Sequence, residues 1–171
     1  MIEGIADLSR QEVEARLWAA LRRLGERDLY LLEVEANERS ITHHLAAYLA
    51  SVFPRWNVDV EYNRDANGED AKKRLHGLRD SLMQAGLDPS RSDLVIPDII
   101  VHRRGSSENL LVVEVKHSGS QEGNNLDHLK LTEFTKPAHR DGLGYRWGAH
   151  AVLARDGTAE VQWFEDGPGI G

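Results

Sequence analysis

The chain lacks cysteine and lacks any long hydrophobic run. Without Cys in its 171 residues, neither a disulfide framework nor a thiolate metal site can form. No apolar stretch approaches the ~18 residues that a membrane span needs. Residues 1–7 also lack the basic start and apolar core of a signal peptide. We therefore expect a cytoplasmic protein with no membrane partner, and the length predicts one domain.

The chain also has fewer basic than acidic residues, 21 Lys and Arg against 28 Asp and Glu. The formal net charge of -7 argues against tight nonspecific binding to duplex DNA, because phosphate contacts depend on Lys and Arg. The deficit is uneven, since residues 1–70 carry a balance of -6 and residues 71–150 a balance of +2. This distribution leaves room for a local basic groove.

Two segments that resemble buried strands each contain an acid. Residues 94–101 read Leu-Val-Ile-Pro-Asp-Ile-Ile-Val, and residues 110–116 read Leu-Leu-Val-Val-Glu-Val-Lys. The acids are Asp98 and Glu114, and both interrupt apolar runs of strand length. Burying an unpaired carboxylate is costly, so such groups usually persist where something neutralises them, and a metal ion is one candidate.

A hairpin between these segments would bring the two acids together. Folding about Ser106 places Asp98 opposite Glu114, with the side chains roughly 5 Å apart, where one divalent cation can bind oxygen from both. Lys116 projects to the same side as Glu114, about 6.6 Å along the strand, and can act beside the ion without ligating it. The alternative is an ordinary ion pair of Glu114 and Lys116 at a surface edge.

Residues 31–53 show helical spacing of apolar residues, with an acid in the stripe. The stripe comprises Leu31, Val34, Ile41, Leu45, Leu49 and Val52. Glu38 falls in its middle, so at about 100° per residue we expect it to face the core or the sheet. If Asn37 or Ser40 caps a helix start instead, Glu38 is an ordinary first-turn acid favoured by the helix dipole.

An Asp, then Glu-x-Lys on the next strand, then an acidic helix upstream together resemble the PD-(D/E)xK nuclease superfamily. Segments at 38–44, 60–64 and 127–131 look like a bacterial subgroup of predicted nucleases, and the likeness covers residues 36–155. It implies an α/β fold with a restriction-endonuclease-like mixed β-sheet core flanked by helices, in the order αβββαβ. We predict this nuclease-like domain over residues 31–166, an extra N-terminal helical extension over 1–30, and a frayed tail at 167–171.

The resemblance implies a Mg²⁺- or Mn²⁺-dependent nuclease that hydrolyses phosphodiester bonds. Asp98, Glu114 and the backbone carbonyl of Val115 would hold the cation, with Glu38 reaching it through water. Lys116 and Glu38 would be the catalytic residues. DNA is the expected nucleic-acid partner. The alternatives are an RNA-processing nuclease and a catalytically silent nuclease-fold module that binds nucleic acid or a protein. A homodimer or a larger complex is left open.

Four basic residues are candidates for contact with nucleic acid: Arg64, Lys73, Arg74 and Lys130. Lys73 and Arg74 belong to a short basic run, which is also typical of a solvated face. Lys130 follows Asp127 by three residues, a spacing equally typical of a solvent-facing helix pair.

Other elements follow from periodicity and turn residues. We predict helices over 8–25 and 126–135, with Gly25 just past the end of the first. A strand is expected over 57–64, then a loop over 65–92 with a short helix around 72–84. Residues 146–154 and 159–164 form a closing hairpin, with the turn at Asp156-Gly157.

Overall fold

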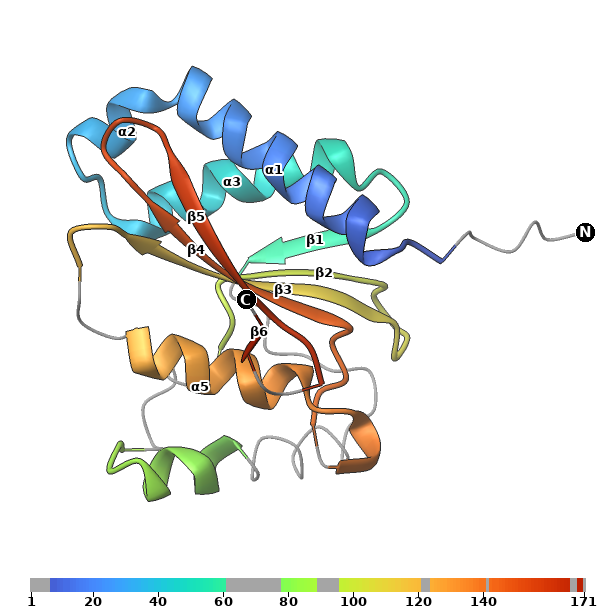
Figure 1. Ribbon diagram of the computed structural model, residues 1–171. Coiled ribbons are helices and arrows are strands. Elements are labelled where there is room, and N and C mark those ends of the chain that lie inside the picture. Colours follow the sequence, from blue (N-terminus) through green and yellow to red (C-terminus); the bar gives the residue numbers. More distant parts are fainter. Residues whose placement is uncertain are drawn as a thin grey trace, which may run out of the picture.

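The protein is a mixed α/β structure with helices on both faces of one sheet (Figure 1). The computed structural model describes residues 7–60, 78–88, 96–120, 124–140, 142–166 and the backbone of 169–170. Its helices are α1 (Arg10–Arg27), α2 (Leu29–Glu33), α3 (Glu38–Val52), α5 (Asn124–Thr135) and the 3-10 helix η2 (Ala138–Arg140), with a further helical stretch at 78–84. None of the described helices is long and apolar enough to cross a membrane.

Six strands form the sheet, and they are ordered as in the sequence. They are β1 (Asn57–Val60), β2 (Ile99–His102), β3 (Asn109–His117), β4 (Trp147–Leu153), β5 (Ala159–Phe164) and β6 (Gly169–Ile170). Neighbouring strands are antiparallel except β3 and β4, which are parallel. A parallel pair needs a crossover connection, and α5 provides it on one face of the sheet.

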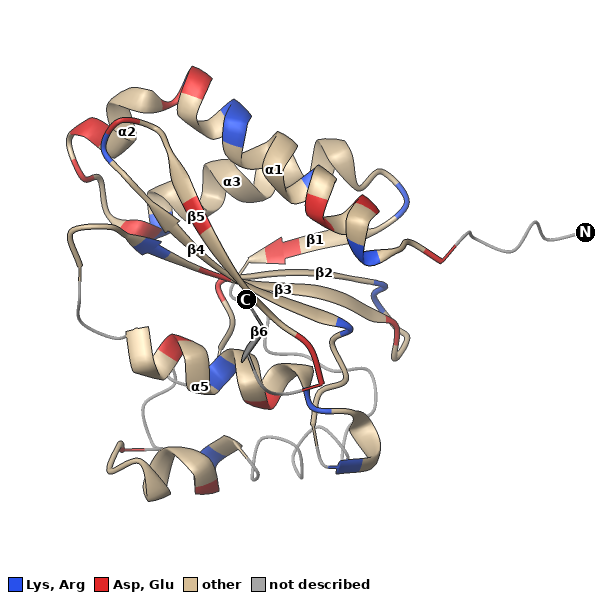
Figure 2. Ribbon diagram, viewed as in Figure 1, with Lys and Arg blue, Asp and Glu red and all other residues tan. Residues whose placement is uncertain are grey.

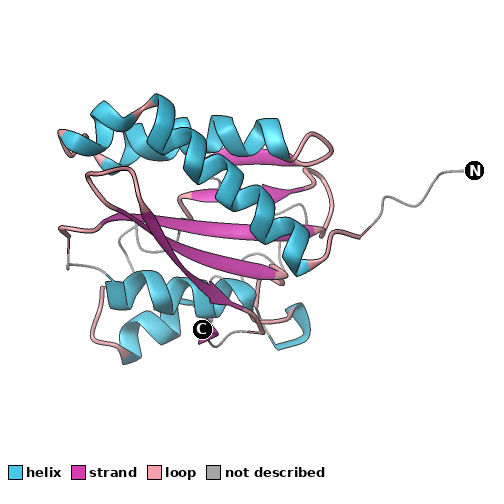
Figure 3. Cartoon of the chain, turned by 45° about the horizontal axis from the view of Figure 1, so that its top comes forward, coloured by secondary structure: helices cyan, strands magenta, loops and turns pink. Residues whose placement is uncertain are grey.

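Alternation along β3 divides the apolar residues between two cores. Leu111, Val113 and Val115 belong to the core shared with α1 and α3. Val112 belongs to the core on the opposite face, which includes Leu131 and Phe134 of α5. Figure 3 shows the sheet between these two helical layers. Because both faces are covered, an acid anywhere in the middle of β3 is removed from water.

The first helix forms as expected but extends past its predicted end. Ser9 caps α1, and its side chain and that of Glu12 form a capping box. The predicted stop at Gly25 is wrong, because α1 continues to Arg27. Gly25 is instead a packing residue: a Cβ there would lie 2.6 Å from the carbonyl oxygen of Gly157. The helix also packs against α3, so α1 shares the main core with the predicted nuclease-like domain.

The apolar stripe over residues 31–53 is divided between two helices, and the alternative of a helix start capped by Asn37 is confirmed. Helix α2 ends at Glu33, and α3 begins at Glu38 after Asn37, whose side chain accepts a hydrogen bond from the Ser40 N–H. Val34 lies in the break and is 51% exposed, so it does not belong to the buried stripe. The Asn37 cap stabilises a new helix start here even though the apolar spacing continues, because the cap pairs a backbone donor that a helix start leaves free.

The C-terminal half follows the prediction closely. Helix α5 begins two residues before the expected start. Strands β4 and β5 pair as a hairpin, and Gly157 in its turn has a φ of 86°, a conformation that glycine adopts without strain. The tail predicted to fray instead contributes β6, which pairs with Trp163 and Phe164.

Candidate functional site

The β2–β3 hairpin has the register that the sequence predicted. Ile99 pairs with Val113 and Ile100 with Val112, so Asp98 and Glu114 are the next residues in the same register. Asp98 continues the pairing with its side chain, because Oδ2 accepts a hydrogen bond of 2.8 Å from the Val115 N–H. Glu114 is only 1% exposed. Two carboxyl groups are therefore adjacent, with Glu114 removed from water and Asp98 half-buried.

Lys130 of α5 binds one of these carboxyl groups directly. Its Nζ lies 2.8 Å from Glu114 Oε2, and both side chains are buried. The solvent-facing reading of Lys130 is thus wrong, since the residue is 4% exposed. It also follows that a metal ion is not the only group able to relieve the repulsion between Asp98 and Glu114. The crossover between β3 and β4 explains this placement, because it lays α5 over the face that Glu114 occupies.

Lys116 lies between acids from two helices on opposite faces of the sheet. Its Nζ is 3.7 Å from Glu38 Oε2 of α3 and 3.4 Å from Asp127 Oδ2 of α5. The alternative of a surface-edge ion pair between Glu114 and Lys116 is wrong, because Glu114 is buried and pairs with Lys130.

Glu38 fits both interpretations that the sequence allowed. It is the first residue of α3 and follows the Asn37 cap, so it is a first-turn acid at the positive end of the helix dipole. Its side chain is 42% exposed, yet Oε2 is buried beside Lys116. The helix start therefore aims this carboxylate at the end of β3. His117 reinforces the placement, because its Nε2 lies 2.8 Å from the Ala36 carbonyl oxygen.

Two histidines that the sequence analysis did not single out, His128 and His150, also lie in the site. His150 of β4 is the register partner of Glu114 across the parallel pair. Its Nε2 lies 3.3 Å from Asp127 Oδ2, and its Nδ1 lies 3.2 Å from His128 Nε2. A polar residue inside the apolar strand Trp147–Leu153 was a usable signal, of the same kind that identified Glu114.

The acidic and basic side chains at this end of the hairpin do not balance in charge. We define the acid–lysine cluster as Glu38, Asp98, Glu114, Asp127, Lys116 and Lys130. Fully ionised, it has four carboxylates and two ammonium groups and carries two excess negative charges. Figure 2 shows charged residues of both signs along α5, on the face of the sheet that carries Glu114.

Burial and crowding shift the titration of these groups. Burial raises the pKa of Glu114 well above its usual value, and the carboxylates of Asp98 and Asp127 add to the shift. Burial also raises the pKa of Asp98, although Lys130 and the Val115 N–H oppose the change. For Lys130, burial lowers the pKa, but Glu114 and Asp98 together raise it above the usual value. Ionised carboxylates are thus held at a cost that an added cation would reduce.

The donor chemistry suits a hard divalent cation. Glu114 Oε1 is buried and has no hydrogen-bond partner among the described residues. The Val115 carbonyl points to the Asp98 side of β3, because the N–H and C=O of one strand residue share a side. Mg²⁺ is commonly held by one or two carboxylates and water. Within the described residues, however, no three or more His, Asp or Glu side chains form a ready metal-binding group.

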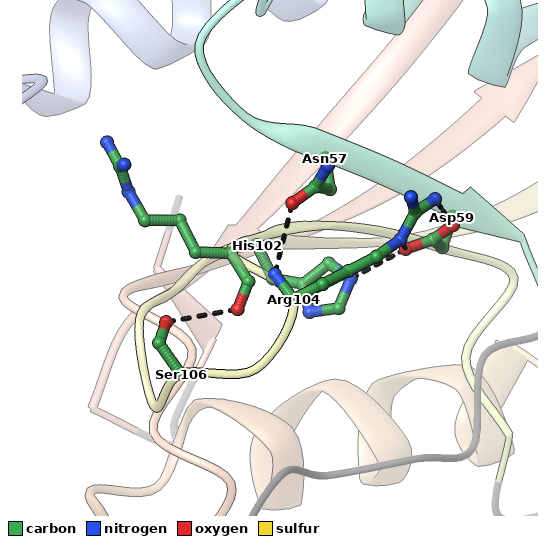
Figure 4. Close-up of polar contacts among 6 residues, drawn as sticks. Asn57, Asp59, His102, Arg104 and Ser106 are labelled. Atoms are coloured by element: carbon green, nitrogen blue, oxygen red, sulfur yellow. Dashed lines mark hydrogen bonds and ion pairs between the residues drawn. The ribbon is translucent and has the colours of Figure 1, made fainter.

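A second polar cluster lies at the turn end of the same hairpin. We define the hairpin cluster as Asn57, Asp59, His102 and Arg104 (Figure 4). Asp59 Oδ2 lies 2.7 Å from His102 Nε2 and accepts a 2.8 Å hydrogen bond from Arg104 Nε, while Oδ1 pairs with the same guanidinium. The Arg104 hydrogen bonds hold the pKa of Asp59 below its usual value, although burial opposes them.

The candidate nucleic-acid contacts are only partly placed. Lys130 lies in the acid–lysine cluster. Arg64, Lys73 and Arg74 lie outside the described residues.

Comparison with known proteins adds no assignment. No family model matches the chain, and neither the curated proteins nor the solved structures contain a significant match.

Proposed function

We propose that the protein is a metal-dependent nuclease that hydrolyses phosphodiester bonds in DNA. One observation carries the proposal: Asp98, Glu114 and Lys116 meet at one end of the β2–β3 hairpin, with Glu38 beside Lys116. A cluster of carboxylate oxygens next to a lysine ammonium suits the hydrolysis of a phosphodiester, because charge must be offset both at the attacking water and at the phosphate.

The order of elements supports the same reading. From α3 to β4 the labelled elements follow as α3, β1, β2, β3, α5 and β4, with a helical stretch at 78–84 between β1 and β2 and η2 before β4, and the sheet is mixed. Apart from these two additional helical segments, this sequence of elements is compatible with the order αβββαβ that the resemblance to the PD-(D/E)xK superfamily implies. A fold carries many functions, so the proposal rests on the cluster, and the order is additional support.

Each residue of the cluster has a distinct part in the proposed reaction. Asp98, Glu114 and the Val115 carbonyl would hold Mg²⁺ or Mn²⁺, with Glu38 reaching it through water. The cation supplies Lewis acidity that activates water and offsets charge on the phosphate. Lys116 orients the attacking water or stabilises the phosphate's developing charge, and Glu38 and Asp127 hold its ammonium in place.

A second candidate function is a module that keeps this fold and binds nucleic acid or a protein without cutting. The contact between Lys130 and Glu114 favours it, because an ammonium already occupies an oxygen that a cation would use. Retention of Asp98, Glu114 and Lys116 together favours the nuclease, since a site without catalysis has no need of all three.

The deciding experiment is a cleavage assay with purified protein. Labelled single-stranded, duplex and branched DNA, and the matching RNAs, are incubated with Mg²⁺, with Mn²⁺ and with a chelator. Lys116→Ala tests the cluster, and Lys136→Ala is the matched control, because Lys136 pairs with Glu133 on α5 away from the acids.

We expect cation-dependent cleavage of DNA that Lys116→Ala abolishes and Lys136→Ala leaves unchanged. Cleavage confined to RNA would change the substrate class and keep the chemistry. If the protein binds these substrates but no cation supports cutting, the non-cutting module is the better description.

A further inference from the structure

The ion pair of Lys130 and Glu114 is the most deeply buried charged contact of the cluster. The side chains are 5% and 2% exposed, and their charged atoms are 2.8 Å apart. A buried pair of this kind is held by its partner charge, since removing either side leaves an uncompensated charge. Lys130 is therefore the group that directly offsets the charge of a Glu114 carboxylate in a site with more acids than bases.

The contact satisfies only part of the site. The ammonium hydrogen bonds to Oε2 of Glu114, while Oε1 has no hydrogen bond among the described groups. Asp98 lies beside Glu114 in the hairpin register, and its Oδ2 is used by the Val115 N–H. A divalent cation can take oxygen from both carboxylates at once, whereas one ammonium neutralises a single charge.

An ammonium and a divalent cation would repel each other at this range. Both would need an oxygen of Glu114, and little water is present to screen them because Glu114 and Lys130 are buried. Lys116 is in a different position, because its partners are Glu38 and Asp127. Among the described basic residues, Lys130 is thus the one that contacts a carboxylate proposed to bind the cation directly, since Glu38, which pairs with Lys116, would reach the cation through water.

We propose that the Lys130 ammonium and a divalent cation compete for Glu114, so that Lys130 sets how tightly the site binds that cation. The inference rests on the proposed cation site and adds a residue that determines its affinity. Lys130 is then neither a ligand nor a contact to the phosphate backbone. It keeps the cluster folded at low cation concentration and makes cation binding weak.

The test is thermal unfolding of the full chain across a titration with MgCl₂ and, separately, MnCl₂. Three proteins are compared: the natural chain, Lys130→Met and Lys136→Met. Met keeps the length and apolar stem of Lys and removes its charge together with its hydrogen-bond donors. Lys136 is the matched control, because it directly follows α5 and pairs with Glu133 at 2.6 Å.

We expect Lys130→Met to melt at a lower temperature than the natural chain in chelator and to gain more from either cation. Its apparent affinity should be at least about tenfold higher, because a repelling charge is gone. Lys136→Met should show the cation response of the natural chain. If Lys130→Met is unfolded in chelator, millimolar cation should restore its circular dichroism signal, and failure to do so overturns the proposal.

The other outcomes separate this inference from the proposed function. If cations stabilise the natural chain and Lys130→Met equally, Lys130 does not compete and the inference is wrong, while the cation site stands. If neither cation stabilises any of the three proteins, there is no competition, and the metal-dependent reading of the site fails with it.

Discussion

The two ends of the β2–β3 hairpin both carry partly or fully buried charged groups, but the carboxylates differ in how completely they are paired and in the direction of their pKa shifts. In the hairpin cluster, both oxygens of Asp59 are paired and its pKa is lowered by Arg104. In the acid–lysine cluster, Glu114 Oε1 has no hydrogen-bond partner within the described part of the chain, and burial raises the pKa of this residue. The first arrangement stabilises a turn. The second holds four acids against two lysines, and this excess of acids is what the proposed cation site rests on.

The largest expected difference between the two clusters is in the rate of nucleic-acid cleavage after a positive charge is removed. Lys116→Ala should reduce cleavage by about 10³-fold or more, because it removes the charge proposed to serve the water and the phosphate. Cation binding and the melting temperature should stay close to those of the natural chain. Arg104→Ala, the same loss of positive charge at the other end, should leave the cleavage rate unchanged. Cleavage at the original rate in Lys116→Ala would mean that the Glu-x-Lys assignment is wrong.

Glu38 tests whether the cluster extends to α3. Glu38→Gln should reduce cleavage by roughly 10²-fold at little cost in stability, since the amide keeps the shape and removes one of four crowded acids. If Glu38 serves only the helix dipole, the change should cost a few tenths of a kcal/mol, measured by urea unfolding, and spare activity. Full activity in Glu38→Gln would remove Glu38 from the site.

The free energy of unfolding should depend more on the hairpin cluster than on the acid–lysine cluster, which is the reverse of the ranking for cleavage. Asp59→Ala should cost about 2 kcal/mol in the free energy of unfolding, because it removes hydrogen bonds to charged groups in a largely buried position. Its cleavage rate should match that of the natural chain. Asp98→Asn should cost less in urea unfolding, because the amide oxygen can still accept the Val115 N–H and a carboxylate with a raised pKa is removed. Equal costs for the two changes would contradict the contrast.

Lowering the pH should change the free energy of unfolding in opposite directions through the two clusters. This effect is smaller, about 1 kcal/mol per pH unit for each group. A raised folded pKa means that folded Glu114 takes up a proton before the unfolded chain does. In chelator, the natural chain should therefore gain stability relative to Glu114→Gln as pH falls from neutral toward 4.5. Asp59 has a lowered folded pKa, so its stabilisation is present above its unfolded value of 3.8 and is lost as pH falls below it.

The control for these curves is Asp59→Asn. Relative to this variant, the natural chain should lose stability only in the acid range below 3.8, opposite in sign to the Glu114 effect. Denaturant unfolding at a series of pH values gives both differences. Curves of the same sign would show that both clusters are ordinary ion pairs.

Local patterns in the sequence determined much of this protein. The period-two alternation of residues 110–116, together with the intervening turn, was enough to place Asp98 beside Glu114. The capping residues Ser9 and Asn37 were visible in the sequence, and the alternative of a helix start at Asn37 anticipated the beginning of α3. These features depend on neighbours within a few residues, so sequence spacing describes them well.

Long-range packing decided the rest of the candidate site. No spacing rule relates Lys130 to Glu114, or His150 to Glu114, because these contacts arise from the crossover of α5 and the parallel pairing of β3 with β4. The sequence alone established that two buried acids needed a counter-charge. Only the tertiary structure decided that Lys130 supplies part of it, because a partner from a distant helix is chosen by how the layers pack rather than by local periodicity.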